Sequence, residues 1–436
     1  MNEQLNQLKW HQRALRMASL EERNAMLLAI ATALENNSDA IQAANEQDLL
    51  EAKKTKLAQP LQKRLSLDAD KLASVAVGVR QVAALADPIG TVRQRRLLDE
   101  GLVLEKVDVP IGVIGMIFES RPDALIQILS LCLKSGNAIV LKGGSEALRT
   151  NAELVATVRK ALEPFGPQSG WIVHLQSRED VKELLSLDHI VDLLIPRGSN
   201  EFVRYIMENT HIPVLGHADG LCAMYIDKEA DVSMAVKVAV DAKTQYPAVC
   251  NAIETLLVHS EVASEFLPLF KKELDRFNVV VHGDQRVASL IPCVAATTKD
   301  WQTEYLDYEI AIKVVDSAQQ AIDHISQYGS GHTDAIITQN KETARQFLQE
   351  VDSADVFWNC STRFADGFRY GLGAEVGIST QKIHARGPVG LEGLVVAKWL
   401  LCGHGDIVDS YEKGEKTYLH RDMPNDGISA MGNKTS

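Results

Sequence analysis

The stretch that decides the fold is Ile111-Gly112-Val113-Ile114-Gly115-Met116-Ile117, an apolar run without a charge. It has the length of a buried strand, whereas a bilayer-spanning helix needs about 20 apolar residues. Pro122 follows at a position that suits the first turn of a helix, and Gly136-Asn137 suit its end. A second apolar run over 138–141 comes next. This order predicts a strand, a helix and another strand.

The same alternation continues along the chain and predicts two α/β series. The first series has expected strands over 111–117, 138–141, 171–173, 190–195 and 212–215. The second has expected strands over 223–226, 255–258, 279–281, 310–315, 335–338 and 356–358. Because helical segments separate the strands, we expect parallel sheets covered by helices on both faces, which is the α/β class.

The residues before this region show a different pattern. Residues 1–85 read as helical, and Ser19-Leu20-Glu21-Glu22 fits a capping box at a helix start. The segments 102–104 and 106–109 are expected to be the two strands of a hairpin. At the other end, residues 421–436 are polar and expected to be disordered.

Length, composition and charge exclude several classes of protein. A chain of 436 residues predicts two or three domains, and 46% apolar with 24% charged residues is typical of a globular protein. The net charge of −13 argues against non-specific nucleic-acid binding, which needs clustered cations. The N-terminal residues lack a secretory signal, and no segment is long enough to cross a membrane. None of the six cysteines forms a C-x-x-C pair, so we expect reduced thiols and a cytoplasmic protein.

Two loops at strand ends are candidates for binding a nucleotide, although no G-x-G-x-x-G motif and no P-loop is present. One contains Lys142, Gly143 and Gly144, where a cation and close backbone approach are both available. The other contains Gly198 and Ser199, where the N–H groups at a helix start suit an anion. The alternative is that both are ordinary strand-to-helix turns.

Cys250 and His217 are candidates for chemistry. Polar residues and Pro247 precede Cys250, so we expect a loop entering a helix, whose positive end would stabilise a thiolate. The alternative is a small buried filler. His217 follows the fifth strand in a loop, where a surface or capping role is the alternative. No spacing of histidines, cysteines and acids predicts a zinc site, since His282, His324, His332 and His384 occur singly.

Five stretches, in this order, resemble the aldehyde dehydrogenase superfamily. They are 109–122, 246–252, 331–336, 359–364 and 378–394. The second reads Tyr246-Pro247-Ala248-Val249-Cys250-Asn251-Ala252. The similarity extends over residues 5–417. It favours the interpretation of Cys250 as a reactive cysteine over the alternative of a small buried side chain without a chemical role. Within the superfamily, the chain resembles reductases that act on an acyl phosphate.

The resemblance implies a domain organisation and a reaction. A Rossmann-type NADP-binding domain, a catalytic domain and a small oligomerisation arm would cover 1–91 with 110–217, 218–399, and 92–109 with 400–420. The implied reaction is the NADPH-linked reduction of L-glutamyl 5-phosphate to glutamate 5-semialdehyde and phosphate, in proline biosynthesis. The implied partners are copies of the chain, as a dimer or tetramer, and in transient contact glutamate 5-kinase. Neither nucleic acid nor a membrane is expected.

The resemblance also implies roles for particular residues. Cys250 would be the nucleophile that carries a thioester. Ser120 occupies the region of a side-chain oxyanion donor, and His217 the position where oxidising relatives have a glutamate that activates water. The implied cofactor residues are Lys142, Gly143, Gly144, Gly198, Ser199 and Glu309. The implied substrate residues are Arg121, Asn251, Ser361, Thr362 and Arg363, with Arg197, Arg369 and Arg386 in reserve.

Two alternatives remain open. Another acyl reductase or aldehyde dehydrogenase of the superfamily, for example one acting on an acyl-CoA, would share most of these residues. A catalytically silent member retained as a scaffold is the other alternative. The joint presence of Cys250, Lys142 and Glu309 argues against the silent member.

Overall fold

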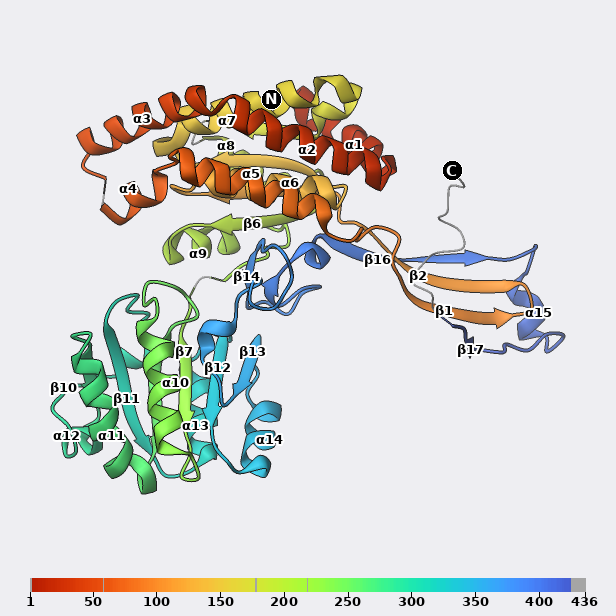
Figure 1. Ribbon diagram of the computed structural model, residues 1–436. Helices are drawn as coiled ribbons and strands as arrows, with labels where there is room; N and C mark the ends of the chain where they lie inside the picture. Colours follow the sequence, from red (N-terminus) through yellow and green to blue (C-terminus); the bar gives the residue numbers. More distant parts are fainter. Residues whose placement is uncertain (1, 58, 177–178, 218, 425–436) are drawn as a thin grey trace. The chain divides into compact units, whose positions relative to one another are not determined.

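The computed structural model describes residues 2–57, 59–176, 179–217 and 219–424 (Figure 1). The chain divides into two compact units. Unit 1 comprises Met1–Ser199, Tyr205–Val214 and Gly390–Ser436, and unit 2 comprises Asn200–Arg204 and Leu215–Val389. The predicted domain boundaries differ from this division mainly in the C-terminal region, where unit 1 already resumes at Gly390.

Unit 1 contains a parallel sheet with strand order β5-β4-β3-β6. Its strands are β3 (Val113–Phe118), β4 (Ala138–Gly143), β5 (Ile172–Leu175) and β6 (Leu193–Arg197). All residues of β3 and β4 are buried, which explains their continuous apolar runs. The expected strand over 212–215 contributes only an isolated bridge between Val214 and Leu194. The chain reverses its direction of travel across the sheet between β3 and β6, which is where ligands of open α/β sheets bind.

Two helices of unit 1 begin where the sequence predicts. Ser19 caps α2, its Oγ accepts a hydrogen bond from the N–H of Glu22, and the Glu22 carboxylate accepts one from the N–H of Ser19. Pro122 is the first residue of α6. The helices are α1 (Asn2–Met17), α2 (Leu20–Asn36), α3 (Ser38–Lys54), α4 (Gln59–Leu65), α5 (Ala69–Ala84), α6 (Pro122–Lys134), α7 (Leu148–Leu162) and α8 (Glu179–Leu185). Helix α9 (Asn200–Glu208) belongs in part to each unit.

A second, antiparallel sheet in unit 1 has the order β16-β2-β1-β17. Its strands are β1 (Val92–Asp99), β2 (Leu102–Pro110), β16 (Val395–Cys402) and β17 (Arg421–Asp422). The prediction that 102–104 and 106–109 are the two strands of a hairpin was wrong, because both lie in β2. The charge of Glu105 does not end the strand, since its buried carboxylate pairs with Arg95 of β1 at 2.9 Å. Residues 421–422, predicted to be disordered, form β17, and 425–436 lie outside the described residues.

Unit 2 contains a parallel sheet with the order β10-β9-β11-β8-β7-β12-β13. Its strands are β7 (Cys222–Ile226), β8 (Ile253–His259), β9 (Val280–Gly283), β10 (Val294–Ala295), β11 (Glu309–Val315), β12 (Thr333–Ile337) and β13 (Asp355–Trp358). Two separate apolar clusters cover the two faces. One contains residues of α10 (Val232–Thr244) and α11 (Ser260–Asp275), and the other contains residues of α13 (Ala318–Tyr328) and α14 (Lys341–Glu350).

The remaining elements are short. They are η1 (Ser145–Ala147), η2 (Glu163–Trp171), α12 (Gln285–Ala288), η3 (Asp300–Gln302), η4 (Thr362–Phe364), β14 (Gly377–Ser379), β15 (Gly387–Val389), η5 (Leu391–Leu394) and α15 (Val408–Glu412). In the part of the chain that the structure describes, none of the helices combines the length and the apolar character that a bilayer crossing requires.

Candidate active site

Cys250 lies in a turn that follows α10 and directly precedes β8. The prediction that it enters a helix was wrong, so no helix N-terminus stabilises its thiolate. The turn is held from two sides. The Sγ of Cys222 donates a hydrogen bond to the carbonyl oxygen of Cys250 at 3.1 Å. Gly220 packs so closely that a Cβ at that position would lie 2.4 Å from the same oxygen, so only glycine fits there.

Two histidines join Cys250 at the amino edge of the unit 2 sheet. Strands β8, β7 and β12 are parallel neighbours, so the segments that lead into them meet at one edge. His217 precedes β7, Cys250 precedes β8 and His332 directly precedes β12. One nitrogen of each histidine and the cysteine sulfur all lie within 4.8 Å of one another. The two rings meet edge to face, with centroids 4.8 Å apart and an interplanar angle of 83°.

The hydrogen bonds of the two rings differ. The Nδ1 of His217 donates to the carbonyl oxygen of Ile378 at 2.9 Å, because a carbonyl can only accept. His332 is fully buried, and its Nδ1 lies 2.8 Å from the Oγ1 of Thr333. Its Nε2 has no hydrogen-bond partner among the described residues. Burial, followed by the charge of His217, lowers the pKa of His332 well below its usual value, so this imidazole is neutral.

Four of the five predicted substrate residues cluster around the Cys250 turn. The Oγ1 of Thr362 donates to the carbonyl oxygen of Asn251 at 2.7 Å, and the Nδ2 of Asn251 donates to the carbonyl oxygen of Ala365 at 2.7 Å. Ser361 caps the short helix η4 that carries Thr362 and Arg363. These contacts bring Asn251, Ser361, Thr362 and Arg363 together, although more than a hundred residues separate the two segments in sequence. The fifth residue, Arg121, belongs to unit 1.

Arg363 is the best positioned arginine of the predicted set. Its side chain is buried, and its Nε donates to the Oε1 of Gln245 at 3.0 Å. Burial lowers the pKa of this guanidinium, Arg369 lowers it further, and the nearby Cys250 sulfur opposes the change. Of the reserve arginines, Arg369 donates to the carbonyl oxygen of Arg363, and Arg386 is committed to Asp352 at 3.0 Å.

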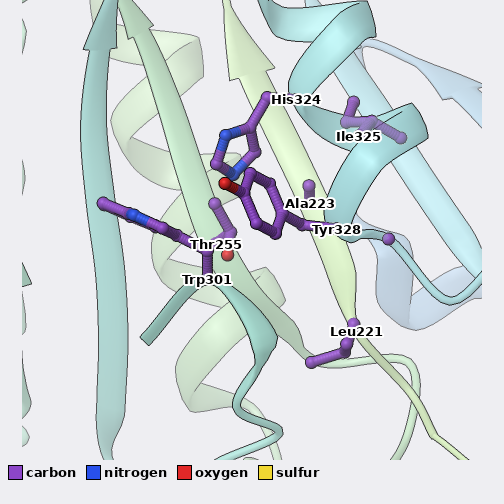
Figure 2. Close-up of a pocket in the computed structure, with 8 residues that line it drawn as sticks. Leu221, Ala223, Thr255, Trp301, His324, Ile325 and Tyr328 are labelled. Atoms are coloured by element: carbon purple, nitrogen blue, oxygen red, sulfur yellow. The ribbon is translucent and has the colours of Figure 1, made fainter. Parts of the chain in front are cut away.

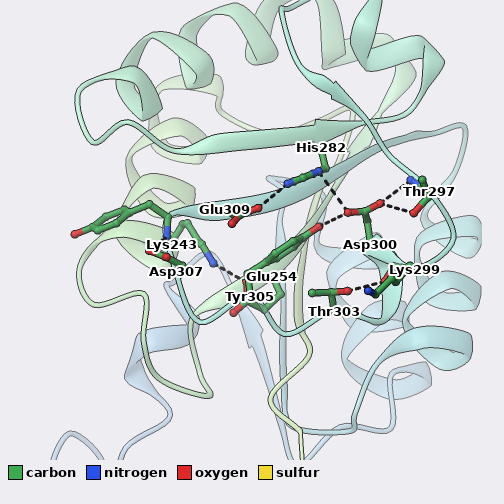
Figure 3. Close-up of polar contacts among 11 residues, drawn as sticks. Lys243, Glu254, His282, Thr297, Lys299, Asp300, Thr303, Tyr305, Asp307 and Glu309 are labelled. Atoms are coloured by element: carbon green, nitrogen blue, oxygen red, sulfur yellow. Dashed lines mark hydrogen bonds and ion pairs between the residues drawn. The ribbon is translucent and has the colours of Figure 1, made fainter. Parts of the chain in front are cut away.

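Glu309, the predicted ligand of the nicotinamide ribose, is held in a network at the start of β11 (Figure 3). Its Oε2 lies 2.8 Å from the Nε2 of His282. The other ring nitrogen of His282 lies 3.4 Å from Asp300, which also accepts a hydrogen bond from the Tyr305 hydroxyl at 2.8 Å. Glu309 is therefore a partner of His282 here, and its cofactor role stays a prediction.

Glu304 is a carboxylate that the sequence reasoning missed. It accepts hydrogen bonds from the Nδ2 of Asn200 and from the backbone N–H of Gly220, the residue that packs against Cys250. Burial raises the pKa of Glu304. Glu304 lies only five positions before Glu309, the glutamate that begins β11. No local pattern in the sequence marks Glu304 as a residue of the site.

A small pocket in unit 2 is lined by aromatic rings and holds none of the predicted site residues (Figure 2). The ring of His324 lies 5.4 Å from that of Trp301 and 4.7 Å from that of Tyr328. Burial, with the charge of Lys313, lowers the pKa of His324 to about 4. His324 is therefore a neutral packing residue at neutral pH.

In unit 1, the loops at the carboxyl ends of β3 and β6 flank the reversal point of the sheet. The N–H of Ser199, which follows Gly198, donates to the Oε2 of Glu119 at 2.9 Å, so an anionic oxygen already sits where a phosphate oxygen would bind. Ser120 has a left-handed backbone with φ of 44°. Its hydroxyl donates to the Oε1 of Glu146 at 2.8 Å. Ser120 is thus engaged with Glu146 rather than available as a donor.

The loop after β4 carries the predicted lysine and glycines. Lys142 is buried, and its Nζ donates to the carbonyl oxygen of Gly143. A Cβ on Gly143 would lie 2.2 Å from the Nδ2 of Asn151, so packing requires glycine. The buried amide of Asn151 has no hydrogen-bond partner among the described residues. A buried cation and an unpaired amide beside a glycine turn fit a polar ligand such as a dinucleotide.

Comparison with known proteins identifies the family. Residues 4–311 match the family model described as the aldehyde dehydrogenase family. The chain belongs to this family. The γ-glutamyl phosphate reductase of Pelotomaculum thermopropionicum is 54% identical over 426 residues, which cover 98% of each chain. The γ-glutamyl phosphate reductase 1 of Synechocystis sp. is 54% identical over 415 residues, covering 94% of this chain and 96% of that one.

Among solved structures, the γ-glutamyl phosphate reductase of Thermotoga maritima superimposes with a TM-score of 0.91 at 39% identity, covering 93% of this chain and 99% of that one. The family and the α/β fold predicted from the sequence are therefore confirmed. Membership of the aldehyde dehydrogenase family implies a nicotinamide cofactor, which agrees with the fit of the loops in unit 1.

Proposed function

We propose that this chain catalyses the NADPH-dependent reduction of L-glutamyl 5-phosphate to L-glutamate 5-semialdehyde and phosphate, a step of proline biosynthesis. The observation that carries the proposal is the 54% identity, over nearly the whole chain, to a protein named γ-glutamyl phosphate reductase. The half-buried thiol of Cys250, beside Arg363 and two histidine nitrogens, supplies the chemistry that such a reaction needs.

Cys250 is the nucleophile in this proposal. Its thiolate attacks the acyl carbon, the carbon–sulfur bond forms, and the bond to the phosphate oxygen breaks. Phosphate is a good leaving group, so no strong general acid is required. His217 belongs to the cluster around the sulfur, and because its Nδ1 donates to Ile378, we assign its other ring nitrogen, Nε2, as the acceptor of the thiol proton. The product of this half-reaction is a thioester on Cys250.

The thioester must be reduced and not hydrolysed. Oxidising relatives place a glutamate where this chain has His217, so the carboxylate that activates water there is absent here, and the Nδ1 of His217 is held by the carbonyl oxygen of Ile378. A bound nicotinamide supplies the hydride. The oxyanion that develops needs a fixed donor, and the backbone N–H of Cys250 is the leading candidate, because the Ser120 hydroxyl already donates to Glu146.

Cofactor preference follows from charge. Lys142 is a buried cation at the end of β4, which favours the additional phosphate of NADPH over NADH. Gly143, Gly144, Gly198 and Ser199 would line the dinucleotide, and Glu309 would meet the nicotinamide ribose. Arg363 and Arg121 would bind the anionic ends of the substrate, with Asn251, Ser361 and Thr362 positioning the segment around them.

An assay in the oxidising direction tests this function. Cyclised glutamate semialdehyde and NADP should give NADPH only when inorganic phosphate is present, because phosphate must release the acyl group. Dependence on coenzyme A in place of phosphate would support the alternative acyl-CoA reductase. Absence of turnover, together with no protection of Cys250 from a thiol reagent by substrate, would support a silent scaffold member.

The assembly and location are also proposals. The antiparallel sheet of unit 1 exposes Val396, Trp399 and Leu401 on β16, which is the apolar surface expected of an oligomerisation arm. We propose a homo-oligomer, a dimer or tetramer, in the cytoplasm. The instability of an acyl phosphate favours transient contact with the glutamate 5-kinase that would make it. Light scattering on Trp399→Lys, which should reduce the molar mass, tests the arm.

A further inference from the structure

The cluster of His217, Cys250 and His332 has the donor set of a transition-metal site. It offers two imidazole nitrogens and one thiol, all within 4.8 Å of one another. This combination of soft sulfur and borderline nitrogen donors is the one that Zn²⁺ prefers. No spacing along the chain indicates this site, because the three residues occur in separate segments that only the neighbouring strands β7, β8 and β12 bring together.

A second observation points to a ligand at this place. His332 has no exposed surface, yet its Nε2 lacks a hydrogen-bond partner among the described residues. A buried polar atom without a partner is destabilising, and a metal ion would satisfy it. Its Nδ1 is held by Thr333, which fixes the ring in the way that outer partners fix metal-binding histidines. The Nδ1 of His217 donates to the carbonyl oxygen of Ile378, which fixes that ring in the same way.

We propose that His217, Cys250 and His332 bind a borderline divalent cation of the Zn²⁺ class, and that this binding reversibly inhibits the enzyme. The Cys250 thiol releases its proton to solvent, a sulfur–zinc bond forms, and no electrons are transferred. A tetrahedral zinc holds sulfur and nitrogen ligands roughly 3.5 Å apart. The longest separation in the cluster must therefore shorten, which rotation of the half-exposed Cys250 side chain can achieve. The fourth position is left for water.

The inhibition rests on the proposed function, because a metal-bound thiolate is no longer available to attack the acyl carbon. Metal binding itself does not depend on that function. The site thus has three protein ligands and an open position, and the same sulfur serves either the ion or the substrate.

Titration with Co²⁺ and Zn²⁺ tests the site without any reference to activity. The full-length protein should bind one equivalent of Co²⁺ with a sulfur-to-cobalt charge-transfer band, and Zn²⁺ should displace it. Cys250→Ser should lose the band. His217→Gln should weaken Zn²⁺ binding by more than the ~10–100-fold typical of losing an outer partner, as should His332→Asn if that variant folds. The controls Cys402→Ser and His189→Gln alter an exposed cysteine and an exposed histidine and should bind like the wild type.

The outcomes are distinct. A charge-transfer band that persists in Cys250→Ser, or equal Zn²⁺ affinity in wild type and His217→Gln, would overturn the site. If the protein binds Co²⁺ through Cys250 but never turns over L-glutamyl 5-phosphate, the metal site stands and the proposed function fails. If the wild type is active, Zn²⁺ should inhibit it, a chelator should restore it, and Cys402→Ser should respond in the same way. Activity unaffected by a saturating equivalent of bound Zn²⁺ would overturn the inhibition.

Discussion

The Sγ of Cys222 donates a hydrogen bond to the backbone carbonyl oxygen of Cys250, 3.1 Å away. The two cysteines nevertheless differ in chemistry. Burial raises the pKa of Cys222 well above its usual value, so this thiol stays protonated and acts as a donor. Of these two thiols, Cys250, in the half-exposed turn, is the one that reagents and substrate can reach.

Selective alkylation follows from this difference. Limiting iodoacetamide should modify Cys250 well before Cys222, because only a thiolate reacts and, of the two, Cys250 is the accessible one. Peptide mass spectrometry after short exposure measures both sites. Preferential labelling of Cys222 in the folded protein would contradict the assignment of these two thiols.

Removing Arg363 should impair substrate use more than cofactor use. Arg363→Ala loses a charge-assisted contact worth about 1.5–3 kcal/mol, which corresponds to roughly a 10- to 150-fold fall in kcat/KM for the acyl phosphate. Steady-state kinetics with each substrate varied in turn provides the comparison. Arg345→Ala, which alters an exposed arginine paired with Glu342 on α14, is the matched control and should behave like the wild type. Equal changes in the substrate and NADPH constants would count against the role of Arg363.

Introducing a carboxylate at position 217 should open a hydrolytic side reaction. His217→Glu places a potential base beside the Cys250 thioester, so acyl phosphate should be consumed without matching oxidation of NADPH. Parallel assays of phosphate release and NADPH oxidation measure this uncoupling. His217→Gln keeps a polar side chain without the base and should stay coupled. A glutamate variant that is as tightly coupled as the wild type would refute the argument about water activation.

The buried pair of Lys243 and Glu254 should be strongly coupled. The Nζ and Oε2 atoms lie 2.6 Å apart, and both side chains are almost fully buried (Figure 3). Lys243→Met leaves the Glu254 carboxyl alone and should lower the free energy of unfolding by about 3–5 kcal/mol, and the double variant Lys243→Met/Glu254→Leu should recover most of it. Burial already raises the pKa of Glu254 to about 7, so the deficit of the single variant should be larger at pH 8 than at pH 5. Urea unfolding measures all three proteins, and a deficit independent of pH would contradict this reasoning.

His324 should contribute an acid-sensitive term to stability. Its pKa falls from 6.5 in an unfolded chain to about 4 in the pocket. As the pH is lowered from 6.5 to 4, the unfolded chain takes up a proton that the folded protein resists, so the free energy of unfolding falls. Above pH 6.5 this contribution is fully present. His324→Phe should flatten that part of the pH profile, whereas His189→Gln, at an exposed histidine, should not; superimposable profiles of wild type and His324→Phe would exclude the effect.

The strands were the most predictable part of the fold. Apolar runs such as 111–117 are buried on both faces, and this burial leaves a continuous signal in the sequence. Residues 212–215 carry a similar run but form only a bridge, because the pattern does not reveal whether a neighbouring strand is available. The hairpin was predicted wrongly because the charge of Glu105 suggested a break between two strands. Its partner Arg95 lies on a strand whose register is set by tertiary pairing, which the local sequence does not show.

The site was predictable only through motifs. Cys250 and Arg363 lie in family-specific stretches and could be named from the sequence. His332 could not be assigned to the site, because its proximity to Cys250 depends on β12 lying beside β7, a strand order that no local pattern encodes. The same holds for the contact between Glu304 and the N–H of Gly220.

The central claim is that Cys250 carries the acyl group, and mass spectrometry of the trapped enzyme tests it most directly. Wild-type protein mixed with glutamate semialdehyde and NADP, in the absence of phosphate, should gain one glutamyl group per chain, mapped to Cys250 and released when phosphate is added. Cys250→Ala, folded by circular dichroism, should gain none. An acyl group found on another residue, or phosphate-dependent turnover by Cys250→Ala, would contradict the account.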